Sequence, residues 1–127
     1  MAHSTLVSFD VDAGRELLST LDHAGLNMDV ALWAFMADYD DPRLVLAGKQ
    51  LDQTHVSKAI QSILEVVRTT DEAQQRMPLF LVYRMKEPFI QDLRRMFSKT
   101  TTMSGMRLGG QSFGGRYIED AYVYRIR

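Results

Sequence analysis

The 127-residue chain contains no cysteine and only three histidines. The absence of cysteine excludes a disulfide framework, a thiol nucleophile, and zinc or iron–sulfur sites held by thiolates. It also makes a reducing compartment, the cytoplasm, the expected location. His3, His23 and His55 lie far apart, and none has the i, i+4 spacing of a helical zinc site. We therefore expect no metal and no cofactor.

Long hydrophobic runs and an excess of one charge are also lacking. No stretch approaches the roughly 20 apolar residues of a membrane span, and the N-terminus lacks the basic start and apolar core of a signal peptide. We therefore expect no membrane association. The net charge of −1 makes nucleic acid the less favoured partner. Residues 1–83 nevertheless hold 6 basic and 12 acidic residues, against 9 and 4 in residues 84–127, so one face can still attract an anion.

Apolar residues at helical spacing predict three helices. The first runs from Asp12 to Ala24, where Gly25 offers a left-handed stop. The second runs from Gln53 to about Thr70. The third is short, because it begins at Pro88 and its apolar stripe ends at Phe97.

Five segments are predicted to be strands. Residues 30–37 are apolar at both alternating sets of positions, as in an inner strand that is covered on both faces. The acidic segment 38–42 that follows is typical of a turn. The remaining strands are expected at residues 43–49, 79–85, 104–108 and 117–127.

The resulting order α-β-β-α-β-α-β-β predicts an α+β fold in a single domain of residues 1–127. We expect one mixed, mainly antiparallel sheet of about five strands, packed with three helices. The β-α-β-α-β part leaves room for a parallel pair, because each helix is long enough for a crossover. The strand order stays open. Residues 1–8 are expected to form a flexible tail, and residues 98–116 a mobile loop region.

The segment from Lys99 to Arg116 combines glycines with basic side chains. Glycine lets backbone N–H groups converge on an anion, and Arg107 and Arg116 can grip a phosphate. Neither the Walker fingerprint nor the dinucleotide fingerprint occurs in the chain. The alternative is a hairpin loop whose glycines serve turns and bulges.

The last strand mixes bulky and charged side chains on both faces. Strict alternation places Ile118, Asp120, Tyr122, Tyr124 and Ile126 on one face and the residues between them on the other. A buried Asp120 needs a partner, which an Arg107–Asp120 or an Arg116–Glu119 pair would supply. This gives a candidate ligand-binding cluster at a pocket mouth: Arg107, Arg116, Glu119, Asp120, Tyr122 and Tyr124. The alternative is a cross-strand ion pair that fixes the register.

The C-terminal part carries a resemblance. The segment 104–107 (SGMR) followed by 117–125 (YIEDAYVYR) resembles the ending of an uncharacterised family of small bacterial α+β proteins. Residues 13–18 and 31–33 are similar to the first helix and first strand of that family, so the resemblance spans most of the chain. It implies a bacterial source. Because the family has no known activity, it implies no catalytic or binding residue.

Two further patterns invite catalytic hypotheses. The acids Asp38, Asp40 and Asp41 at a strand end are a magnesium-binding arrangement in nucleases, but Ala47 stands where the nuclease pattern before Lys49 needs an acid. Residues 110–114 (GQSFG) match the Gly-x-Ser-x-Gly motif of the nucleophile elbow of serine hydrolases. The elbow needs a helix after its serine, however, whereas a strand is expected here, and no histidine follows.

Three hypotheses for function remain. The first is a non-enzymatic protein-interaction module that binds itself as a homodimer or another protein, with Phe113 at a loop tip as a contact. The alternative is a binder of an anionic ligand, a nucleotide or nucleic acid, through the Lys99–Arg116 loop. A small hydrolase is the least favoured, so we expect no enzyme.

Overall fold

The computed structural model describes residues 9–68, 77–97, 99 and 105–127. This part of the chain contains three α-helices: α1 (Val11–His23), α2 (Val56–Arg68) and α4 (Pro88–Phe97). A short 3-10 turn, η2 (Leu51–Gln53), precedes α2. The strands are β1 (Val30–Met36), β2 (Arg43–Ala47), β3 (Phe80–Val82), β4 (Met106–Leu108), β5 (Gln111–Phe113) and β6 (Arg116–Ile126). The α+β prediction is confirmed, with one strand more than expected.

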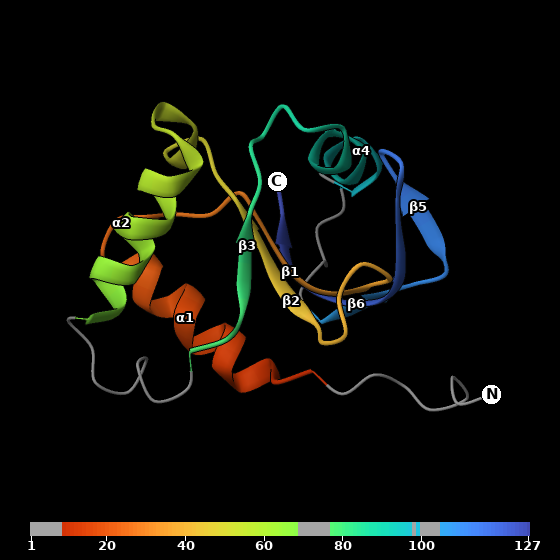
Figure 1. Ribbon diagram of the computed structural model, residues 1–127, viewed down its shortest axis with the longest axis horizontal. Helices are drawn as coiled ribbons and strands as arrows, with labels where there is room; N and C mark the ends of the chain where they lie inside the picture. Colours follow the sequence, from red (N-terminus) through yellow and green to blue (C-terminus); the bar gives the residue numbers. More distant parts are fainter. Residues whose placement is uncertain (1–8, 69–76, 98, 100–104) are drawn as a thin grey trace.

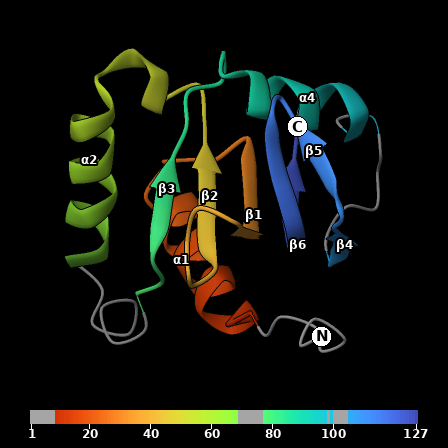
Figure 2. The same cartoon turned by 45° about the vertical axis from the view of Figure 1, so that its right-hand side comes forward.

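The strands form one mixed sheet in the order β3-β2-β1-β6-β4, and β5 also pairs with β6 (Figure 2). All pairs are antiparallel except β2 and β3, which run parallel because α2 crosses between them. Trp33 on the central strand β1 faces Leu44 of β2 on one side and Tyr122 of β6 on the other. The mainly antiparallel sheet is thus confirmed.

Helices cover both faces of the sheet. The helices α1 and α2 lie on one side and α4 on the other (Figure 1). On β1, Ala31 and Trp33 pack toward α1 and α2, whereas Leu32 and Ala34 pack toward α4. This central strand is buried on both faces, as its sequence predicts.

Local signals fix the ends of the helices. Asp10 caps α1, and its carboxylate accepts a hydrogen bond from the N–H of Ala13 at 3.1 Å. Gly25 follows the helix with a φ of +80°, which supplies the left-handed stop. Pro88 opens α4, where a missing N–H costs nothing.

The strict alternation predicted for β6 is wrong. Ile118 and Ile126 lie on the α4 side together with Ala121 and Val123. The register of β6 against β1 shifts twice, and each shift gives β6 one residue more than its partner, at Glu119 and at Tyr124. A bulge of this kind reverses the alternation from that point onward.

The glycine-rich segment is a strand arm rather than a plain loop. β4 and β5 pair with β6 in one continuous register, so residues 106–113 form a single hairpin arm that is interrupted at Gly109 and Gly110. Gly114 and Gly115 close the hairpin with φ values of +54° and +84°, as a two-residue type I′ turn requires. Residues 98 and 100–104 of the expected loop lie outside the described residues.

The position predicted for Phe113 is wrong. Its side chain is 0% exposed and packs in the core, with its ring centre 6.1 Å from that of Phe97 on α4. Phe113 is the last residue of β5, and its direction in the strand aims it at α4. A buried ring cannot meet a partner, so the proposed contact at Phe113 is withdrawn.

Candidate functional site

The structure separates the predicted polar cluster. Arg107 and Asp120 form the expected cross-strand ion pair, with a further hydrogen bond of 3.3 Å from Nε of Arg107 to Oδ1 of Asp120. Glu119 is exposed at a bulge. Arg116 lies elsewhere, at the hairpin turn, where its guanidinium is 3.8 Å from the carboxylate of Asp38. The Arg107–Asp120 pair can therefore fix the register of β4 against β6, whereas Arg116 belongs to a different site.

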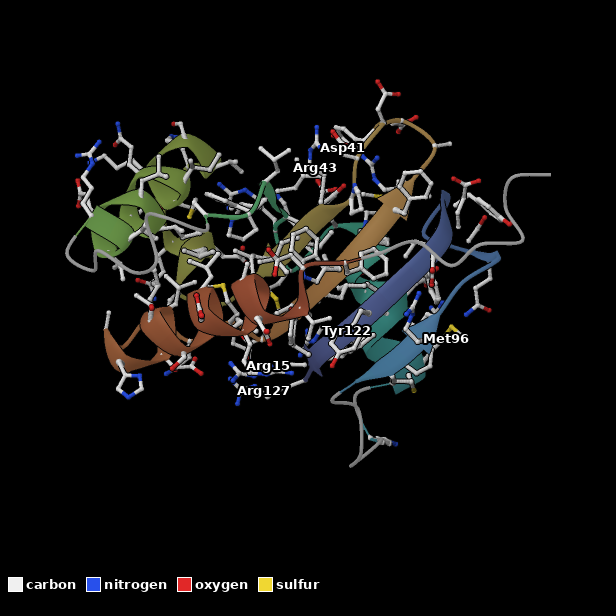
Figure 3. All side chains as sticks on the ribbon, turned by 90° about the horizontal axis from the view of Figure 1, so that it is seen from below. Arg15, Asp41, Arg43, Met96, Tyr122 and Arg127 are labelled. Atoms are coloured by element: carbon white, nitrogen blue, oxygen red, sulfur yellow. The ribbon has the colours of Figure 1, made fainter. Side chains whose placement is uncertain are left out.

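The two predicted tyrosines pack beneath α1. Tyr124 donates its hydroxyl proton to the carbonyl of Val11 at 2.6 Å and accepts the indole N–H of Trp33 at 3.0 Å. Burial raises the pKa of Tyr124 to about 12, against the lowering effect of the Trp33 hydrogen bond, so this hydroxyl stays protonated in neutral solution. Tyr122 lies beside the end of α1 (Figure 3) and packs edge-on against Tyr124. This pair ties α1 to the sheet.

Three glycine N–H groups of the predicted anion cradle have partners inside the protein. The N–H of Gly105 donates to the carbonyl of Val123, and that of Gly110 to the carbonyl of Ile118. The N–H of Gly114 donates to the carboxylate of Asp92 on α4 at 2.6 Å. These three donors are engaged within the protein, so they do not converge on a ligand.

The two catalytic patterns also lack their geometry. Ser112 lies in β5 opposite Tyr117, and a hairpin turn follows it where an elbow requires a helix. The acids of segment 38–42 lie in the turn between β1 and β2, and Asp38 faces Arg116. Among the described residues, no three side chains of histidine, aspartate or glutamate gather as a metal site.

A different surface combines an open strand edge with apolar side chains. β3 ends the described sheet and pairs with β2 alone. The N–H of Leu44 donates to the carbonyl of Leu79, and the N–H of Tyr83 donates to that of Leu46. Because successive peptide groups of a strand point to opposite sides, the N–H and C=O groups of Phe80 and Val82 point away from β2.

The helix α2 extends this surface. One stripe of α2 is buried against the sheet: Ala59, Ile63 and Val67. On one flank of that stripe, Ser62 and Val66 line a groove with the chain that leaves α1. At 100° per residue, Ile60 and Leu64 fall on the opposite flank, whereas Val56 continues the buried stripe at the first residue of the helix, where its side chain is 38% exposed.

The outer flank of α2 lies toward the free edge of β3. Hydrogen bonds tie α1 to β6, through Asp22 and Arg125 among others, whereas α2 contacts β3 at the other end of the sheet (Figure 2). The flank turned away from α1 is therefore on the β3 side. Val56 is 38% exposed, Leu64 37% and Leu79, just before β3, 57%. We call this region the β3 surface: Val56, Ile60, Leu64, Leu79, Phe80 and Val82.

The opposite edge of the sheet differs in character. The arm formed by β4 and β5 is interrupted by two glycines, carries the charged Arg107, and is anchored to α4 through Asp92. Such features discourage pairing with a further strand. β3 contains no charge, no proline and no glycine. The two edges are therefore not equivalent.

The β3 surface was not predicted from the sequence. The spacing of the apolar positions of residues 56–67 predicts the helix, but it does not distinguish the positions that face the sheet from those that stay exposed.

Comparisons with known proteins supply no function. No protein-family model, curated protein or solved structure matches the chain. In the part of the chain that the structure describes, every helix is too short or too polar to cross a membrane.

Proposed function

We propose that the protein is an interaction module that binds a second copy of itself through the β3 surface. The observation that carries this proposal is the uncharged outer edge of β3, where the peptide groups of Phe80 and Val82 have no strand partner among the described residues and lie beside an exposed apolar flank of α2. Unpaired strand edges of this kind recruit a further strand.

Two β3 strands fit each other in the antiparallel direction. The outward groups of Phe80 would bond those of Val82 in the partner copy, and Leu81 would face its own counterpart across the two-fold axis. The outer flanks of the two α2 helices would then approach each other, which buries Ile60 and Leu64. A second copy is the favoured occupant because an uncharged, apolar edge is complementary to itself.

Lysine substitutions test the proposal. Leu64→Lys combined with Leu79→Lys is expected to weaken self-association at least about tenfold, because two charges per copy would lose their hydration in the interface. Sedimentation equilibrium at several protein concentrations measures the effect. Met96→Lys is the matched control, since Met96 is 54% exposed on α4 and outside the β3 surface.

The outcomes are distinct. A concentration-dependent dimer in the wild type and in Met96→Lys, but not in the double variant, supports the proposal. A wild type that stays monomeric contradicts self-association and directs the search to a different protein partner. An equal loss in both variants would assign the contact to another surface.

A further inference from the structure

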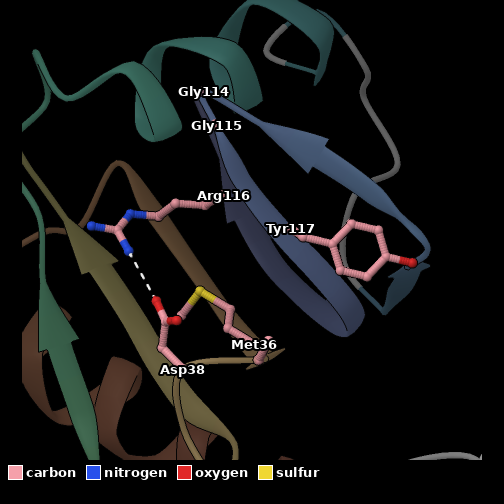
Figure 4. A pocket seen from close by; sticks show the side chains of 7 residues that line it. Met36, Asp38, Gly114, Gly115, Arg116 and Tyr117 are labelled. Carbon is pink, nitrogen blue, oxygen red and sulfur yellow. Dashed lines mark ion pairs between the residues drawn. The ribbon is translucent and has the colours of Figure 1, made fainter.

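A second feature, separate from the β3 surface, is a cavity of about 390 Å³. It lies where the turn after β1 meets the hairpin turn before β6, and no residue of the β3 surface lines it (Figure 4). Cavities that hold small ligands begin at about 300 Å³. The lining is Met36, Ala37, Asp38, Gly114, Gly115, Arg116 and Tyr117.

Two opposite charges face each other at this cavity. Figure 4 shows the guanidinium of Arg116 opposite the carboxylate of Asp38, whereas the ring of Tyr117 points away. The two charged groups are 3.8 Å apart, which is beyond hydrogen-bond distance. Their side chains are 41% and 74% exposed. An ion pair this open and exposed contributes little to stability, so a ligand can replace it at small cost.

The guanidinium of Arg116 packs over the ring of Tyr83. Its central carbon lies 5.4 Å from the centre of the Tyr83 ring. Tyr83 is itself fixed, because it is 8% exposed and packs edge-on against Phe89 of α4. Stacking on a rigid ring positions an arginine before a ligand arrives, which reduces the entropy lost on binding.

The charges around the cavity define the ligand. The guanidinium matches a carboxylate with two parallel hydrogen bonds. Asp38 opposite it matches an ammonium group, and it repels a second negative charge. Burial raises the pKa of the nearby Tyr83, Arg116 opposes the rise, and Glu87 and Asp38 add smaller increases. The carboxylate of Asp38 at the cavity disfavours phosphates with several charges.

We infer that this cavity binds a small zwitterion, an α-amino acid, with its carboxylate on Arg116 and its ammonium group on Asp38. The side chain of the ligand would lie over the apolar floor at Met36, which is 3% exposed. The small residues Ala37, Gly114 and Gly115 leave the space that the ligand fills.

Thermal unfolding and titration calorimetry with a set of probes test this inference. The probes are the common α-amino acids, the matched carboxylic acids without the amino group, the matched amines, and inorganic phosphate. At least one amino acid is expected to bind about tenfold or more tightly than its matched acid and amine. Arg116→Met is expected to abolish this binding.

Asp38→Asn tests the proposed contact with the ligand's ammonium group separately from the contact of its carboxylate with Arg116. It is expected to reduce the affinity for the amino acid to that for the matched carboxylic acid, without loss of stability, because Asp38 is exposed. Asp41→Asn is the control, since Asp41 lies in the same turn outside the cavity lining. Tight binding of phosphate, equal binding of acid and amino acid, unchanged binding in Asp38→Asn, or no binding of any probe would each overturn the inference.

Discussion

Replacing Gly114 with alanine is expected to destabilise the protein by about 2–5 kcal/mol. Gly114 has a φ of +54°, which alanine adopts at a cost of about 1–2 kcal/mol. A Cβ atom there would also lie 2.3 Å from the backbone nitrogen of Phe89 and from the carbonyl carbon of Pro88. These atoms belong to the first turn of α4 and cannot rotate away, so the hairpin and the helix would have to separate.

Gly115→Ala is the matched control for this substitution. Gly115 has a φ of +84°, and a Cβ atom there would meet nothing within 4 Å. It therefore carries the backbone cost alone, about 1–2 kcal/mol. Urea unfolding of both variants measures the difference. Equal losses of stability would contradict the close packing of α4 on the hairpin turn.

Gly14→Ala is expected to lower stability, although glycine to alanine inside a helix usually adds about 1 kcal/mol. Gly14 lies in α1 against the sheet, and its Cβ atom would lie 2.3 Å from the hydroxyl of Tyr124 and 2.8 Å from the indole nitrogen of Trp33. The hydroxyl would have to leave both of its hydrogen bonds. We expect a net loss of about 1–3 kcal/mol, measured by urea unfolding.

A double-mutant cycle tests the stated cause. Tyr124→Phe alone should cost about 1–2 kcal/mol, because it leaves the indole N–H of Trp33 without its partner. In that background the oxygen that meets the new Cβ atom is gone, so Gly14→Ala should cost clearly less than in the wild type. Additive effects would show that the loss arises elsewhere in α1.

The features that depend on local pattern could be predicted from the sequence. The stripe of α1 and the doubly apolar run of β1 are periodic over many residues, so their structure follows from which positions are buried. The Arg107–Asp120 pair was also predictable, because a hairpin places residues of its two arms opposite each other. The parallel pair was anticipated only as an option, since the strand order depends on packing between distant segments.

The features that were missed depend on distant contacts. Two bulges in β6 arise from its pairing with β1, and they moved Ile118 and Ile126 to the other face. Phe113 is buried because α4 packs on the hairpin, which no local signal near the glycines reveals. The charged residues of the proposed cavity also meet through a distant contact, since Asp38 and Arg116 are 78 residues apart in the sequence.

Because the chain contains no cysteine, a single introduced cysteine gives the most direct test of self-association. In the proposed antiparallel pair, Leu81 faces its counterpart at a Cα separation of about 4.5 Å, which a disulfide can span. Leu81→Cys is therefore expected to form a covalent dimer under mild oxidation, whereas Met96→Cys is not. The account is contradicted if Leu81→Cys stays monomeric, or if both variants cross-link equally, because then the two β3 strands do not meet.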